Sequence, residues 1–180
     1  MTATRSQFSW AVREASGAYL QGPEEIHGST FRGHVVSVPD GDTINVQTRF
    51  GGPVPVRLAG IDSPELAQPF GVEAGNYTRA ELLDKDVTIL MLGRDKYNRV
   101  VGVVFDETEE NFNAMKVLKG LAWVYPDYND NPLNEFLSDL QTRAQNEDAG
   151  LWGGTGAKEH FVPALWRLLK RRGVLHPSPD

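Results

Sequence analysis

The chain has 180 residues, 40% of them hydrophobic, and a formal net charge of −6. This length and composition allow one domain with a substantial apolar core, which excludes a disordered chain as the default. Cysteine is absent, which excludes disulfide scaffolds, thiolate metal sites and cysteine nucleophiles.

The sequence has no run of about 18 apolar residues, so we expect no stable membrane insertion. Its first twenty residues contain no continuous apolar segment of the kind that a secretory signal requires. The default expectation is a cytoplasmic protein. The alternative is a secreted or periplasmic protein from which the signal has been removed.

Residues 1–28 are expected to form an N-terminal extension that carries no chemistry. Four of its residues recur at helical spacing and predict one amphipathic helix: Phe8, Val12, Ala15 and Tyr19. Gly22-Pro23 would end this helix, because the pair is a strong turn signal.

Short strands are predicted from Phe31 onward. Runs of β-branched and aromatic residues, bounded by turn signals, predict five strands: Phe31–Val38, Thr43–Thr48, Val54–Ile61, Val87–Leu92 and Val100–Phe105. Asp40-Gly41 is a turn signal between the first two strands. Asn98 suits a tight turn between the last two, because Asn tolerates positive φ.

Helices are predicted between and after these strands. The expected helices are about Val72–Asp84, a segment through Ala114 that Gly120 ends, and a segment from Pro132 to Ala144. Five short strands interrupted and followed by helices predict an α+β, mainly β fold. We expect a five-stranded OB-fold barrel over residues 29–156, with about three covering helices and a helical extension at each end.

The C-terminal extension, residues 157–180, differs in charge from the domain. It carries five basic and two acidic residues, whereas residues 31–156 carry eleven basic and nineteen acidic ones. Pro163–Arg172 is a predicted short helix with leucines on one face. This helix could pack its leucines on the domain, which we favour, contact phosphates or lie on an anionic membrane. The two extensions could also mediate oligomerisation.

Three segments carry residues suited to chemistry: VPDGDT at 38–43, VRLAGIDSPE at 56–65 and RDKYNR at 94–99. Taken alone, Asp40 is most simply a turn residue. Arg57 is equally consistent with a solvated strand face and with a buried position among partners. An EF-hand loop is excluded because neither the Gly nor the Glu of such a loop stands at the required spacing. The four histidines show no zinc-ligand spacing.

Together, the segments bring three carboxylates and two arginines to strand ends and adjoining loops: Asp42, Asp62, Glu65, Arg57 and Arg99. Phosphodiester hydrolysis needs such a set. A hard divalent cation prefers carboxylate oxygens, and a further carboxylate can take a proton from the attacking water. Arginines bind phosphate oxygens in bidentate fashion and stabilise the charge that grows in the transition state.

The strings PDGDT, VRLAGIDSPE and DKYNR, in this order, resemble the signature of the staphylococcal nuclease family. GLAWVY at 120–125 and GLWG at 150–153 fit the same family, so the resemblance covers about residues 31–153. It implies an OB-type barrel with three helices. It also implies a calcium-dependent nuclease that cleaves DNA and RNA and leaves a 3′-phosphate and a 5′-hydroxyl.

The resemblance also implies a role for each residue of the set. Asp42 and Asp62 would be carboxylate ligands of Ca²⁺, and Ser63 would contribute its backbone carbonyl. Glu65 would be the general base, or would orient the attacking water. The two arginines, Arg57 and Arg99, would bind the scissile phosphate.

Three further residues, Lys96, Tyr97 and Tyr125, match positions near the nucleotide or could stack on a base, although a solvated or packed role stays open for each. A catalytically silent module that binds nucleic acid or protein is the alternative function. We favour the enzyme, because a silent module has no reason to keep all five residues of the set. The short loop at residues 66–71 and the acidic domain are departures that would alter site access and weaken nucleic-acid binding.

Overall fold

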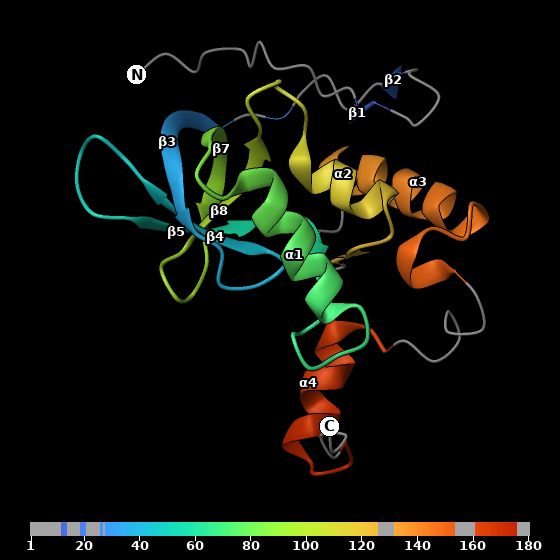
Figure 1. Ribbon diagram of the computed structural model, residues 1–180. Helices are drawn as coiled ribbons and strands as arrows, with labels where there is room; N and C mark the ends of the chain where they lie inside the picture. The colour runs from blue at the N-terminus through green and yellow to red at the C-terminus, as the bar shows by residue number, and fades with distance from the viewer. Residues whose placement is uncertain are drawn as a thin grey trace.

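The computed structural model describes residues 12–13, 19–20, 26, 28–125, 132–153 and 161–175. Its centre is a closed barrel with the strand order β3-β4-β5-β8-β7 (Figure 1). The barrel strands are β3 (Ser29–Ser37), β4 (Thr43–Gln47), β5 (Val54–Leu58), β7 (Asp86–Arg94) and β8 (Val100–Phe105). The five-stranded barrel that the sequence predicted is confirmed.

Strands β5 and β8 pair in parallel, whereas the other neighbours in the barrel pair antiparallel. Parallel partners need a long crossover connection, and α1 (Gly71–Leu82) and β7 lie in the chain between them. Branched aliphatic side chains fill the barrel interior and are fully buried: Val35, Ile44, Val56, Ile89 and Val103. This packed interior fixes the strand ends from which the polar side chains of the site project.

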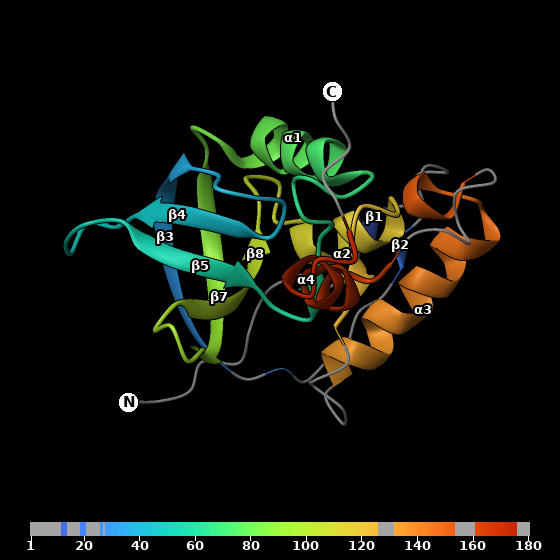
Figure 2. The ribbon, with the colours of Figure 1, turned by 90° about the horizontal axis from the view of Figure 1, so that it is seen from below.

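Three further helices follow the barrel strands: α2 (Phe112–Leu118), α3 (Pro132–Asn146) and α4 (Pro163–Arg171). A short 3-10 helix, Gly150–Trp152, follows α3. Helices α2 and α3 pack together on one side of the barrel, and α1 runs along its edge (Figure 1). Figure 2, from below, shows α4 nearly end-on, between the barrel and α3.

The third barrel strand is shorter than the sequence predicted. It ends at Leu58, and the chain turns at Gly60, whose φ of 73° is easy only for glycine. The chain then enters a separate short strand, β6 (Ile61–Asp62), which pairs antiparallel with β9 (Trp123–Val124). Asp62 therefore lies on a two-stranded sheet beside the barrel.

The prediction of an amphipathic helix near the N-terminus is wrong for the residues that the structure describes there. β1 (Val12–Arg13) and β2 (Tyr19–Leu20) form an antiparallel pair instead of a helix. Pairing through the backbone competes with a helical pattern of only four apolar residues. Phe8 and Ala15 lie outside the described residues.

The C-terminal helix exists as predicted, and its leucine face is covered only in part, because Leu169 is half-buried. Leu165 and Leu168 of α4 are each 38% exposed, and Pro163 is the buried residue of the helix. The expected domain boundary at residues 156–157 lies outside the described part of the chain. No helix in the described ranges is long and apolar enough to span a bilayer.

Candidate active site

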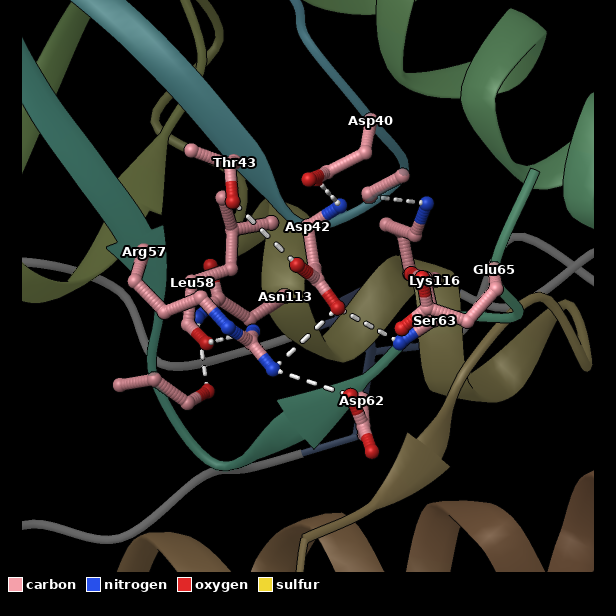
Figure 3. Close-up of polar contacts among 12 residues, drawn as sticks. Asp40, Asp42, Thr43, Arg57, Leu58, Asp62, Ser63, Glu65, Asn113 and Lys116 are labelled. Carbon is pink, nitrogen blue, oxygen red and sulfur yellow. Dashed lines mark hydrogen bonds and ion pairs between the residues drawn. The ribbon is translucent and has the colours of Figure 1, made fainter. Parts of the chain in front are cut away.

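Two buried carboxylates form the centre of the site (Figure 3). Asp42, directly before β4, is 8% exposed, and Asp62, at the end of β6, is 4% exposed. Nη2 of Arg57 lies 3.2 Å from Asp42 Oδ2 and 3.2 Å from Asp62 Oδ1. One guanidinium group therefore joins both carboxylates, and Arg57 proves to be buried among partners.

The loop before β4 is held against the segment after β6. The backbone N–H of Ser63 donates to Asp42 Oδ2 at 2.8 Å. Gly41 permits this approach, because a Cβ added there would lie 2.7 Å from Ser63 Cβ. The hydroxyl of Ser63 is buried and has no hydrogen-bond partner among the described residues.

Burial raises the pKa of Asp62, and the neighbouring charge of Asp42 adds to the increase, while hydrogen bonding and charge from Arg167 and Arg57 oppose it. Burial likewise raises the pKa of Asp40, and the charge of Asp42 adds to this shift. Burial is therefore the main cause of both shifts, and it disfavours the charged form of each carboxyl.

Lys116 of α2 binds the loop before β4. Its side chain is fully buried, and Nζ donates to Gly41 O at 2.6 Å, Ala74 O at 2.9 Å and Thr78 Oγ1 at 2.7 Å. Burial lowers the pKa of Lys116 to about 7, against the opposing charges of Asp42 and Asp40. This lysine ties α2, α1 and the loop before β4 together.

The second arginine of the set reaches the edge of the site through Thr43. Arg99 Nη1 donates to Thr43 Oγ1 at 3.4 Å, and Thr43 pairs with Arg57 across β4 and β5. Asp95 orients Arg99 by accepting from its Nε at 2.8 Å. Thr43 therefore connects Arg99 to the strand pair that carries Arg57.

Residues 55–154 match the protein-family model described as staphylococcal nuclease homologue. The chain belongs to the staphylococcal nuclease family. The matched range includes Arg57, Asp62, Glu65 and Arg99, whereas Asp42 precedes it.

Several relatives of this family align over most of the chain. An Escherichia coli protein named uncharacterized endonuclease is 35% identical over 163 residues, covering 91% of this chain and 93% of the relative. A Shigella flexneri protein named micrococcal nuclease is 34% identical over 152 residues, covering 80% and 84% respectively. A Haemophilus influenzae protein named uncharacterized endonuclease is 34% identical over 133 residues, covering 74% and 71%.

Glu65 lies beside the paired carboxylates in the loop between β6 and α1. Its side chain is 41% exposed, and its Oε1 lies 2.6 Å from Nη1 of Arg167 on α4. The backbone N–H of Glu65 donates to Gln68 Oε1 at 3.1 Å, which anchors the short loop. Sequence reasoning for the family found Glu65 but not its partner Arg167.

The three expected substrate contacts lie at different distances from the centre. Tyr97 is 69% exposed in the turn after β7, and Lys96 and Arg99 stand over its ring at 5.2 and 5.6 Å. Tyr125 is half-buried, and its N–H donates to Gly60 O at 2.9 Å beside β6. Tyr97 therefore offers an open ring next to Arg99, whereas Tyr125 offers a partly covered one.

Sequence reasoning missed Lys116 and Arg167. Lys116 lies three residues after Asn113 and directly before the buried Val117, which places it on the inward side of α2. This spacing was the only available signal, and it does not show which oxygens the lysine meets. The sequence did not mark Arg167 as a site residue, because the helical spacing placed it away from the leucine face that we expected to pack.

Proposed function

We propose that this protein is a calcium-dependent nuclease that hydrolyses phosphodiester bonds of DNA and RNA by in-line attack of water. The nuclease reaction rests on the family and on relatives named endonuclease and micrococcal nuclease. The calcium ion, the range of substrates and the products, a 3′-phosphate and a 5′-hydroxyl, are the finer part of the proposal. The observation that carries it is the meeting of Asp42, Asp62 and Arg57 within 3.2 Å.

Asp42 and Asp62 are the carboxylates that would hold the cation, together with the backbone carbonyl of Ser63. The described residues include no group of three or more His, Cys, Asp or Glu side chains placed to hold a metal. Two carboxylates, a carbonyl and water nevertheless suit Ca²⁺, which accepts mixed oxygen ligands. The buried hydroxyl of Ser63, which has no hydrogen-bond partner among the described residues, supports this fit. When bound, such an ion neutralises phosphate charge and promotes ionisation of water.

Arg57 and Arg99 would bind the scissile phosphate. Arg99 reaches Thr43 Oγ1, and Thr43 is the strand partner of Arg57, so a phosphate bound at this end of β4 and β5 would meet charged groups from both arginines. Asp95 and the carbonyl of Leu58 orient these groups through hydrogen bonds to Arg99 Nε and Arg57 Nη1. Orientation before substrate arrives reduces the reorganisation that the transition state requires.

Glu65 would accept the proton of the attacking water. Its side chain is partly exposed, so it can reach water beside the buried carboxylates without being a ligand itself. The proton would pass to the Glu65 carboxylate as the water oxygen bonds to phosphorus and the 5′-oxygen leaves. Lys96, Tyr97 and Tyr125 would bind the flanking nucleotide.

Hydrolysis of single-stranded DNA with Ca²⁺ or with EGTA, in the wild type and Glu65→Gln, tests this proposal. Glu73→Gln, which removes an acidic residue from the first turn of α1, is the matched control. We expect calcium-dependent cleavage that Glu65→Gln loses and Glu73→Gln keeps, with 3′-phosphate ends detected by mass spectrometry. Nucleic-acid binding without cleavage in any divalent metal would instead identify a silent binding module.

A further inference from the structure

Helix α4, which lies outside the range matched to the family model, contacts the centre of the site through one side chain. Arg167 Nη1 lies 2.6 Å from Glu65 Oε1, and its Nη2 lies 3.1 Å from Asp62 Oδ2. Nη1 also reaches Asp62 Oδ1 at 3.4 Å. One guanidinium group therefore binds two carboxylates that belong to different proposed steps.

These contacts occupy the atoms that the proposed chemistry needs. Both oxygens of Asp62 are engaged, because Oδ1 also receives Arg57 Nη2 at 3.2 Å. Oε1 of Glu65, the proposed proton acceptor, is occupied by Nη1 of Arg167. A divalent ion approaching Asp62 would meet the positive charge of Arg167 at short range.

The rest of α4 is covered only in part, with Trp166 and Leu169 half-buried. Within this fully described helix, Pro163 is the buried residue, while Leu165 and Leu168 keep 38% of their surface exposed. Before the helix, the carbonyl of Phe161 accepts a hydrogen bond from Gln68 Nε2. The ion pairs of Arg167 therefore contribute to the docking of α4. Arg167 and Glu65 are 38% and 41% exposed, so water can replace this pair, whereas Asp62 is 5% exposed.

We propose that α4 is an autoinhibitory element that docks Arg167 on Asp62 and Glu65 and must leave before the cation and substrate bind. The inference rests on the proposed function for the identity of the site. It predicts that the apparent affinity for calcium is reduced by the fraction of molecules in which α4 is docked. The exposed leucines of α4 remain exposed in this docked state, so they are no obstacle to release.

Calcium titration calorimetry on the full chain tests the competition. We compare the wild type with Arg167→Ala and with Lys170→Ala, which removes the same charge from an exposed position of α4. If α4 is docked in nine wild-type molecules of ten, Arg167→Ala should bind Ca²⁺ about tenfold more tightly than the wild type. Lys170→Ala should bind Ca²⁺ within about twofold of the wild type. Equal affinities in the two variants would overturn the proposal.

Cleavage of single-stranded DNA gives the second readout. At calcium concentrations below saturation, Arg167→Ala should cleave faster than the wild type, and at saturation the two rates should converge. A lower rate for Arg167→Ala at saturating calcium would make Arg167 a catalytic group and would also overturn autoinhibition.

The position of α4 can be measured independently of activity. The chain contains no cysteine, so a pair introduced at Val72 on α1 and Lys170 on α4 can carry spin labels. Arg167→Ala should replace one narrow distance distribution by a longer and broader one, and an unchanged distribution would overturn the docking role. If no variant binds calcium or cleaves DNA, the proposed function fails, while this distance still decides the docking.

Discussion

Lys116 and Gly41 are 75 positions apart in the chain, yet Lys116 Nζ donates to the Gly41 carbonyl oxygen at 2.6 Å. The carbonyl belongs to the loop that ends at Asp42, so the buried amino group of Lys116 supports the loop that carries one of the two central carboxylates. A buried lysine is costly unless its donors are satisfied. Here three oxygens accept hydrogen bonds from Nζ, and these bonds hold the loop in place.

The stability of the wild type relative to Lys116→Met should depend on pH. Burial lowers the pKa of Lys116 from 10.5 to about 7, so between these values the unfolded chain binds more protons than the folded one. The contribution of this group to the free energy of unfolding therefore rises with pH, by ~3 kcal/mol from pH 7 to 9.5. Urea unfolding of both proteins at pH 6, 7, 8 and 9.5 measures the difference.

The methionine variant keeps the length of the side chain. Thr78 Oγ1 lies 2.8 Å from Gly41 O and 3.0 Å from Ala74 O, so its single proton can still be donated to one of them. Lys119→Met, at an exposed position just after α2, is the control for the loss of one lysine, and the result for Lys116→Met is compared with it. A constant difference for Lys116→Met across the range would mean that Lys116 keeps its proton in the folded protein.

Gly41→Ala should separate the two segments that carry Asp42 and Ser63. The added Cβ would lie 2.7 Å from Ser63 Cβ, so the loop must shift, at a cost of about 1–3 kcal/mol. Calcium affinity should fall together with thermal stability, measured by titration calorimetry and differential scanning calorimetry.

Gly75→Ala is the matched control for that change. Gly75 lies inside α1, and a Cβ there meets nothing within 4 Å. Alanine should stabilise this helix by about 0.5–1 kcal/mol and leave calcium affinity unchanged. Equal behaviour of the two variants would contradict the argument from steric contact.

The barrel and most of the site were predictable because their signals are local or ordered along the chain. Runs of β-branched residues between turn signals predicted the five strands, and Asn98 takes the positive φ, 64°, expected of its turn. The contact of Arg167 with Asp62 joins residues 105 positions apart. No spacing within α4 predicts which distant carboxylate an exposed arginine will meet.

The expectations that failed or held only in part have a common physical origin. Apolar spacing predicted a helix through Val12 and Tyr19 and a packed leucine face on α4, but spacing shows only which residues share a face. Whether that face is covered depends on partners elsewhere in the fold. β1 and β2 pair with each other, and α4 docks through Arg167 with its leucine face covered only in part.

Arg57→Lys should reduce kcat/KM for DNA by about 100-fold or more, because a lysine cannot present two parallel donors to a phosphate. It should also loosen the site, since one ammonium cannot reach Leu58 O and both carboxylates as the guanidinium does. Arg32→Lys, on an exposed position of β3, is the control and should keep full activity. Steady-state kinetics at saturating calcium measure both, and a loss of less than about fivefold for Arg57→Lys would contradict phosphate binding by a fork.

Tyr97→Ala should raise KM for DNA while leaving kcat and thermal stability close to those of the wild type. The ring is 69% exposed and lies 5.6 Å from the Arg99 guanidinium carbon, so it can stack on a base whose phosphate Arg99 binds. Stacking is worth about 1–3 kcal/mol per base, which corresponds to a rise in KM of roughly fivefold to a hundredfold. Tyr97→Phe keeps the ring and should keep the wild-type KM.

If Tyr97→Phe loses as much affinity as Tyr97→Ala, the hydroxyl and not the ring makes the contact. If kcat falls with KM unchanged, Tyr97 instead acts through Arg99, whose guanidinium its ring helps to position.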